Sequence, residues 1–127
     1  MKHEIKFYHC GTCGNIITKL TDSGMPVSCC GKEMTLLAPN TTDAATEKHV
    51  PAVTRTGNNL KVQVGSTLHP MTEEHHIAWI VVAQDGKVQT ATLSPTGEPV
   101  AEFVIADGSA TVYEYCNLHG LWATEVA

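Results

Sequence analysis

The chain has 127 residues, 43% of them hydrophobic, and a formal net charge of −5 at pH 7, which suits a soluble globular protein with one ordinary core or a smaller core and a metal-stabilised module. The acidic balance and the lack of any Lys/Arg run argue against a nucleic-acid partner. The longest apolar run, residues 77–83, is too short to span a membrane, and the charged first residues lack the apolar stretch of a signal peptide, so we expect a cytoplasmic protein.

The first expected unit, residues 1–37, carries four of the five cysteines. Short strands are expected at residues 5–9 and 16–20, and a turn at residues 22–26. The chain has five cysteines, an odd number, which argues against a disulfide framework and for metal thiolates. A bound metal would also stabilise a unit whose hydrophobic core is so small. The four candidate ligands are Cys10, Cys13, Cys29 and Cys30. On spacing alone zinc and iron both fit, and the adjacent pair predicts a distorted tetrahedron.

Residues 38–46 are small, polar and turn-forming, and we interpret them as a linker to a second domain, residues 47–127. This domain shows no helical stripe. Its pattern predicts strands at residues 60–64, 77–83, 88–93, 100–106, 111–116 and 121–126, with Asp-Gly turns at 85–86 and 107–108. Six or seven short strands indicate an all-β fold, in which an immunoglobulin-like antiparallel β-sandwich follows the small metal-stapled module along the chain.

Five residues of the second domain lie in three compact signatures: Glu47-Lys48-His49-Val50-Pro51, His69-Pro70-Met71-Thr72-Glu73-Glu74-His75 and Cys116-Asn117-Leu118-His119-Gly120. We expect His49, His69 and His75 on loops, and Cys116 to His119 on the turn between the last two strands. Four imidazoles and one thiolate are one ligand more than a closed structural zinc site uses, and they suit iron, copper, nickel or zinc. On an ion that favours six ligands one position stays open, which predicts redox chemistry on a small molecule. A cysteine nucleophile is the alternative.

The same motifs resemble the desulfoferrodoxin family of two-iron superoxide reductases, over essentially the whole chain. The Cys-x-x-Cys and Cys-Cys pairs resemble the desulforedoxin-like module, and the three later signatures resemble the neelaredoxin-like catalytic domain. The resemblance implies two iron ions per chain. The first is an Fe(Cys)4 centre on Cys10, Cys13, Cys29 and Cys30; the second is an Fe(His)4(Cys) centre with His49, His69, His75 and His119 as equatorial ligands and Cys116 as the axial thiolate.

One position departs from the family pattern. His76 stands where the family more often shows an aromatic residue, so either His75 or its neighbour would be the ligand, and the six-residue separation from His69 favours His75. Neighbouring side chains of an extended backbone point to opposite sides, so both cannot bind one ion.

The resemblance also implies a reaction, the reduction of superoxide to hydrogen peroxide with electrons from a rubredoxin-like donor, a detoxification. Lys48 would attract the anion and, through water, help to protonate the product. Glu47 would ligate the resting ferric iron at the sixth position. The first centre would either relay electrons or serve structure, including the formation of a homodimer.

Three other functions fit parts of the pattern. A non-enzymatic iron protein of electron transport would have a closed second site that azide or cyanide cannot enter. A zinc-binding module would hold zinc in both sites and be colourless. A superoxide dismutase would also produce dioxygen.

Overall fold

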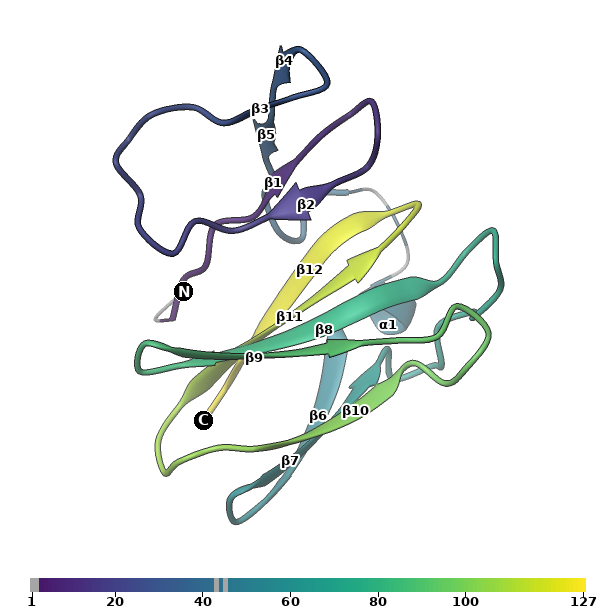
Figure 1. Cartoon of the computed structure of the whole chain (residues 1–127). Helices are drawn as coiled ribbons and strands as arrows, with labels where there is room; N and C mark the ends of the chain where they lie inside the picture. The colour runs from purple at the N-terminus through teal and green to yellow at the C-terminus, as the bar shows by residue number, and fades with distance from the viewer. Residues whose placement is uncertain (1–2, 43, 45) are drawn as a thin grey trace. The chain divides into compact units, whose positions relative to one another are not determined.

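β-Structure dominates the computed structural model, which describes residues 3–42, 44 and 46–127 (Figure 1). The chain divides into two units: residues 5–38, and residues 39–127 together with the N-terminal segment 1–4. One short helix is present in the described part, α1 (Thr46–His49). No helix among these residues has the length and apolar character needed to cross a membrane.

The unit of residues 5–38 is built from two-residue strands. A three-stranded antiparallel sheet has the order β2-β1-β5, and β3 pairs with β4 as a hairpin. Its strands are β1 (Tyr8–His9), β2 (Ile16–Ile17), β3 (Ser28–Cys29), β4 (Lys32–Glu33) and β5 (Thr35–Leu36). Only Phe7, Cys10 and Met34 are buried among the hydrophobic residues described in this unit. So few apolar contacts leave a module of this size in need of a metal staple.

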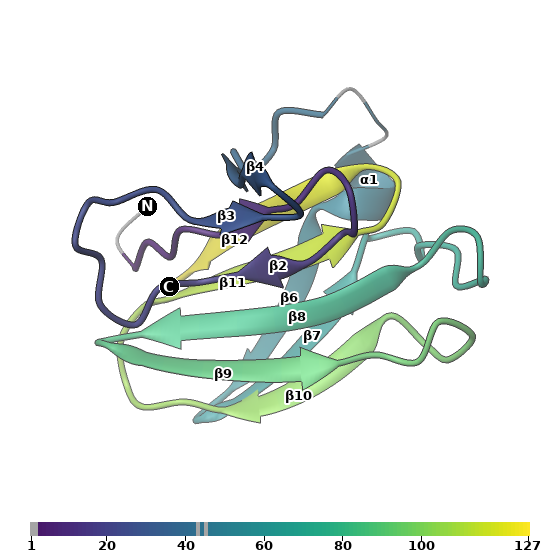
Figure 2. The same cartoon turned by 45° about the horizontal axis from the view of Figure 1, so that its top comes forward.

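The second unit is a sandwich of two antiparallel sheets, and Figure 2 shows them as facing layers. One sheet has the order β12-β11-β8-β9 and the other the order β10-β7-β6. The strands are β6 (Pro51–Thr56), β7 (Asn59–Val64), β8 (Ile77–Gln84), β9 (Lys87–Thr92), β10 (Val100–Val104), β11 (Ala110–Cys116) and β12 (Gly120–Val126). The predicted all-β fold with an antiparallel sandwich is confirmed, and seven strands are described where six or seven were expected.

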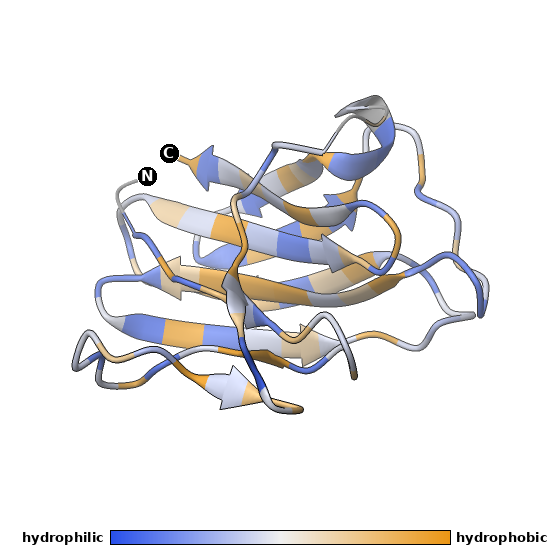
Figure 3. Cartoon of the chain, turned by 90° about the horizontal axis from the view of Figure 1, so that it is seen from above, coloured by the Kyte–Doolittle hydropathy of each residue, from blue (hydrophilic) through white to orange (hydrophobic). Residues whose placement is uncertain are grey.

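The core of the sandwich follows from the two-residue period of its strands. Leu60, Val62 and Val64 of β7 are fully buried, whereas the residues between them are less so, and Figure 3 shows this alternation of hydrophobic and hydrophilic positions along the strands. They pack in one cluster with Ile80 of β8 and Val112 of β11 from the other sheet. The interior therefore lies between the two sheets.

Two features were not predicted. β6 begins with Pro51 and continues with small and polar residues, so its apolar alternation is weak. His49 was expected on a loop, but it ends α1, which a hydrogen bond from the Val50 N–H to the Thr46 carbonyl closes at 2.9 Å. A helix of one turn has no room for a hydrophobic stripe, so periodicity does not detect it.

A shift in strand register beside Cys116 brings Ile77 into the core of the sandwich. Tyr115 pairs with Trp79, but Cys116 pairs with Ile77, so Ala78 of β8 is the extra residue of a β-bulge. Cys116 and Ile77 are both fully buried members of the core cluster. Without the bulge, Ile77 would point to the other face of its sheet.

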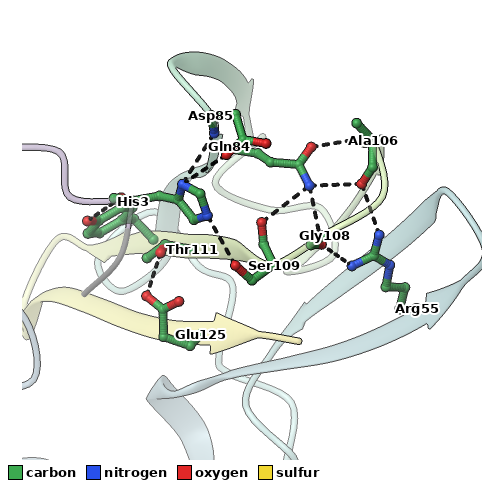
Figure 4. Close-up of polar contacts among 10 residues, drawn as sticks. His3, Arg55, Gln84, Asp85, Ala106, Gly108, Ser109, Thr111 and Glu125 are labelled. Atoms are coloured by element: carbon green, nitrogen blue, oxygen red, sulfur yellow. Dashed lines mark hydrogen bonds and ion pairs between the residues drawn. The ribbon is translucent and has the colours of Figure 1, made fainter.

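The two ends of the sandwich differ in character. α1 and the loop between β7 and β8 lie at the end where β11 turns into β12, because the register pairs Pro51 with Val64 and Cys116 with both Ile77 and Gly120. The opposite end is tied by polar contacts among loops, as Figure 4 shows. There Arg55 donates to the carbonyls of Gly108 and Ala106. This closed end fixes the strands whose other ends carry the candidate ligands.

Candidate metal centres

Five side chains converge at the end of the sandwich where β11 turns into β12. Each offers one ligand atom, and these atoms all lie within 4.8 Å of one another. The five residues are His49 at the end of α1, His69 and His75 in the loop between β7 and β8, Cys116 at the end of β11, and His119 in the turn before β12. This is the set that the three signatures predict, brought together from four segments of the chain.

The four imidazoles form a square. Neighbouring ring centroids along the order His49, His69, His75, His119 are 4.6 to 5.0 Å apart, and each neighbouring pair is nearly perpendicular. The His49–His75 pair is 6.4 Å apart and nearly parallel, as a diagonal of that square should be. Four rings around one centre could together hold one metal ion.

Ring nitrogens of neighbouring histidines lie within hydrogen-bond distance of one another at the centre of the square. His49 Nε2 is 3.0 Å from His119 Nδ1 and 3.2 Å from His69 Nε2. The Nδ1–H of His69 donates to the Pro70 carbonyl at 2.7 Å, so its Nε2 is left with a lone pair toward the centre. An outer hydrogen bond of this kind orients a metal-binding histidine.

Cys116 supplies the sulfur from the buried side of the cluster. The residue is fully buried, and its Sγ lies 3.4 Å from His69 Nε2 and 3.9 Å from His119 Nδ1. Burial raises the pKa of the Cys116 thiol, while the backbone N–H groups of Leu118 and His119 act in the opposite direction. The turn thus presents donors to a thiolate that needs a metal ion to stay ionised in its buried place.

The structure separates His75 from His76. The His75 Nε2 is buried in the cluster and has no hydrogen-bond partner in the described part of the chain, whereas the His76 Nδ1–H is directed to the Thr72 carbonyl at 2.9 Å. A buried imidazole nitrogen with no partner is costly in the protein alone and is what a metal ion would satisfy. The donor set and this orphaned nitrogen therefore fit a resident metal.

The cluster favours neutral imidazoles. Burial lowers the pKa of His69 to about 4, despite its bond to Pro70, and burial also lowers the pKa of His75. A metal binds the neutral ring, so these shifts keep the ligands in their binding form at pH 7.

Trp122 supports the cluster and was not singled out from the sequence. Its ring stacks on His49 with centroids 5.0 Å apart, and its Nε1–H donates to the His119 carbonyl at 3.1 Å. The only sequence signal is its position two residues after Gly120 at the end of the cysteine signature. Gly120 itself has φ +80°, and a Cβ there would lie 3.1 Å from Thr42 Oγ1, so the last signature needs a glycine.

The four other cysteines form a second candidate centre in the unit of residues 5–38. Their sulfurs also lie within 4.8 Å of one another, with Cys13 Sγ 3.6 Å and Cys30 Sγ 4.0 Å from Cys29 Sγ. The adjacent cysteines reach one point because Cys30 and Gly31 both have positive φ, 53° and 74°, and form the two-residue turn of the β3–β4 hairpin.

Backbone donors favour a thiolate at Cys10. The N–H groups of Cys13 and Thr12 lower the pKa of Cys10 to about 6, and the Cys13 N–H lies 3.5 Å from its sulfur. The Asn15 side chain donates to Cys29 Sγ at 3.7 Å. By contrast, the neighbouring thiols Cys13 and Cys10 raise the pKa of Cys30 to about 12, as expected of sulfurs crowded without a cation.

The two charged residues predicted for catalysis lie in α1 beside His49. Lys48 is exposed. Glu47 belongs to the same helix, but its side chain lies outside the described part, and its role stays a prediction.

Similarity to known proteins agrees with this geometry. A profile of the family described as desulfoferrodoxin matches residues 41–125. A desulfoferrodoxin of Syntrophotalea carbinolica is 46% identical over 125 residues, which cover 98% of this chain and 99% of the relative. The chain belongs to the desulfoferrodoxin family. The resemblance inferred from the motifs is confirmed.

Solved structures extend the likeness of this desulfoferrodoxin to three dimensions. The superoxide reductase of Treponema pallidum has a TM-score of 0.78 and 35% identity, and the match covers 95% of this chain and 98% of that one. The superoxide reductase (1Fe-SOR) of Giardia intestinalis has a TM-score of 0.56 and 33% identity, and covers 63% of this chain and 97% of its own. The first match therefore includes nearly all of this chain, whereas the second leaves more than a third of it unmatched.

Proposed function

We propose that this desulfoferrodoxin is a superoxide reductase that converts superoxide, one electron and two protons to hydrogen peroxide. The observation that carries the proposal is the square of four imidazoles with the buried Cys116 sulfur beside it. His49, His69, His75, His119 and Cys116 would hold one iron ion, and Cys10, Cys13, Cys29 and Cys30 a second. Bound iron would supply the one-electron chemistry that no side chain of this set offers. A rubredoxin-like donor, a homodimer and any relay through the four-cysteine centre stay predictions.

The chain's own groups have three tasks in this reaction. α1, the β7–β8 loop and the β11–β12 turn hold the imidazoles and the thiolate at one end of the rigid sandwich, and burial keeps His69 and His75 neutral. The backbone donors of Leu118 and His119 support the Cys116 thiolate. Lys48, exposed next to His49, carries a positive charge for an anionic substrate and a proton source for the product.

Metal content and colour test the proposal directly. We expect two iron ions per chain and visible bands from two distinct centres, one of which changes when ascorbate reduces the protein. A Cys116→Ser variant should lose the bands of the five-ligand centre and keep those of the four-cysteine centre, because thiolate donation to iron gives the first its colour. A colourless protein with zinc in both sites would contradict the proposal and favour the zinc-binding module. Dioxygen as a product would favour a dismutase.

The charge of Lys48 should control the encounter with superoxide. Replacing Lys48 by glutamine is expected to slow the superoxide-dependent step about tenfold at low salt and to weaken its dependence on ionic strength, because local positive potential attracts the anion. The control is Lys87→Gln, which removes the same charge at the start of β9, at the opposite end of the sandwich. Pulse radiolysis measures both rates. Equal rates and equal salt dependence in the two variants would remove Lys48 from the mechanism.

A further inference from the structure

Asn117 joins the two loops that carry most of the five-ligand cluster. It follows Cys116 in the turn between β11 and β12, and it faces the loop between β7 and β8. Its side-chain oxygen accepts a hydrogen bond from the His76 N–H at 2.9 Å, and its side-chain NH2 donates to the Glu74 carbonyl at 3.0 Å. Its own backbone N–H donates to the His76 carbonyl at 3.2 Å. These three bonds bracket His75 on both sides.

The segment around His75 is stiff in itself. The Thr72 N–H donates to the His75 carbonyl at 2.9 Å, and the Thr72 hydroxyl accepts from the His75 N–H at 3.0 Å. The His76 ring adds a bond to the Thr72 carbonyl. A closed turn of this kind moves as one piece, so the contacts that hold its ends determine where the His75 ring lies.

The other imidazoles of the cluster have supports of their own. His69 is held by the Pro70 carbonyl, His49 stacks on Trp122, and the Trp122 Nε1–H holds the His119 carbonyl. His75 is less buried than His49 and His69, and its Nε2 has no hydrogen-bond partner among the residues that the structure describes. Its position therefore depends on the backbone of its loop.

We propose that Asn117 is a positioning residue for the fourth imidazole: it locks the His75 turn to the Cys116–His119 turn, so that His75 and the thiolate face one metal ion at a fixed spacing. The proposal rests on the metal site proposed above. An amide can accept from the His76 N–H with its oxygen and donate to the Glu74 carbonyl with its NH2 at the same time. Aspartate has the same shape but places a second acceptor against the Glu74 carbonyl, and leucine has neither group.

Loss of the two side-chain hydrogen bonds of Asn117 should weaken the metal site without disturbing the sandwich. Groups that orient a metal ligand typically change metal affinity by about 10- to 100-fold when they are removed. We expect Asn117→Asp and Asn117→Leu to lose iron from the five-ligand centre at about 10- to 100-fold lower chelator concentration than the unaltered chain. The visible bands that depend on Cys116 should also shift, since one of the four nitrogens is displaced.

Asn58 provides the matched control. Its side-chain NH2 donates to the Ile105 carbonyl at 2.8 Å and to Asp107 at 3.2 Å, at the opposite end of the sandwich. Asn58→Ala should lower the thermal stability of the metal-free chain as much as the Asn117 variants do, yet leave chelator resistance and the visible bands unchanged. This comparison separates positioning of a ligand from a general loss of stability.

A second measurement works without metal. In NMR spectra of the metal-free full chain, Asn117→Asp should move the ring signals of His75 and leave those of His49 in place. If the Asn117 variants match the unaltered chain in chelator resistance, bands and His75 signals, the positioning role is wrong. If the unaltered chain itself binds no iron through Cys116, the proposed function is wrong and this role falls with it. The two failures are thus distinguished by the parent protein alone.

Discussion

Replacing His75 by alanine is expected to reduce the iron content from the two ions proposed for the parent to one. It should lower superoxide reduction by at least about 100-fold, because loss of a ligand exceeds the usual effect of losing an outer contact. Replacing His76 by alanine should keep both ions. The structure places the His75 Nε2 in the cluster and directs the His76 ring to the Thr72 carbonyl. The second change therefore costs activity no more than about tenfold, the worth of one hydrogen bond.

The pair is a close test because the two residues are neighbours of the same type. Both variants remove one imidazole from one loop, so losses of helix, sheet or charge are matched. Iron per chain by elemental analysis, together with the Cys116-dependent absorption, reports which imidazole binds. If His76→Ala loses the second iron and His75→Ala keeps it, the ligand assignment is exchanged. If both keep it, the square is not the iron site.

Most of the sandwich was predictable from alternating or continuously apolar segments that turn residues separate. Residues 60–64 show the pattern most clearly, and β7 has its buried positions at Leu60, Val62 and Val64. The Asp85-Gly86 turn between β8 and β9 was also predicted, and it lies where the pairing of Gln84 with Lys87 requires. β6 was missed because only Val53 among its inward positions is a typical strand residue, while Pro51 and Arg55 beside it obscure the alternation.

The ligands of the candidate site were predictable from local signatures, but their supports were not. His69 and Cys116 come from motifs that can be read along the chain. Trp122 and Asn117 act through contacts with loops far away in the sequence, and those contacts depend on how β11 pairs with β8 and β12. The bulge at Ala78 likewise follows from pairing and has no mark in the sequence.

Glu114 is another residue that only the structure singles out. It lies on β11 between the cross-strand neighbours Ile80 and Trp122, on the inward face that also carries Val112 and Cys116. The residue is fully buried, and neither carboxylate oxygen has a hydrogen-bond partner within the described residues. Burial raises the pKa of this carboxyl well above its ordinary value. An orphaned acid of this kind costs stability whether or not it is charged.

Replacing Glu114 by methionine, which has similar length, is expected to stabilise the metal-free chain by about 1–3 kcal/mol at pH 7. The gain should depend on pH. Above the ordinary pKa of 4.5, the unfolded chain releases the Glu114 proton while the folded chain retains it, so the stability of the parent falls as pH rises toward the higher folded pKa. The methionine variant lacks this loss, and its advantage should therefore be smallest near pH 4.5 and grow with pH.

Urea unfolding of both metal-free chains between pH 4.5 and 8 measures this difference, and titrations shared by the two chains, such as those of His69 and His75, cancel in it. Glu102→Met is the control, because Glu102 is exposed on β10 and its replacement should change the stability of the chain only slightly. Parallel stability curves for the parent and the Glu114 variant would mean that the carboxyl is solvated or paired in solution. A gain that grows with pH means instead that β11 carries a destabilising acid two residues before Cys116. Glu114 then lowers the stability of β11, the strand that positions Cys116. A functional constraint on the sequence would act on this strand.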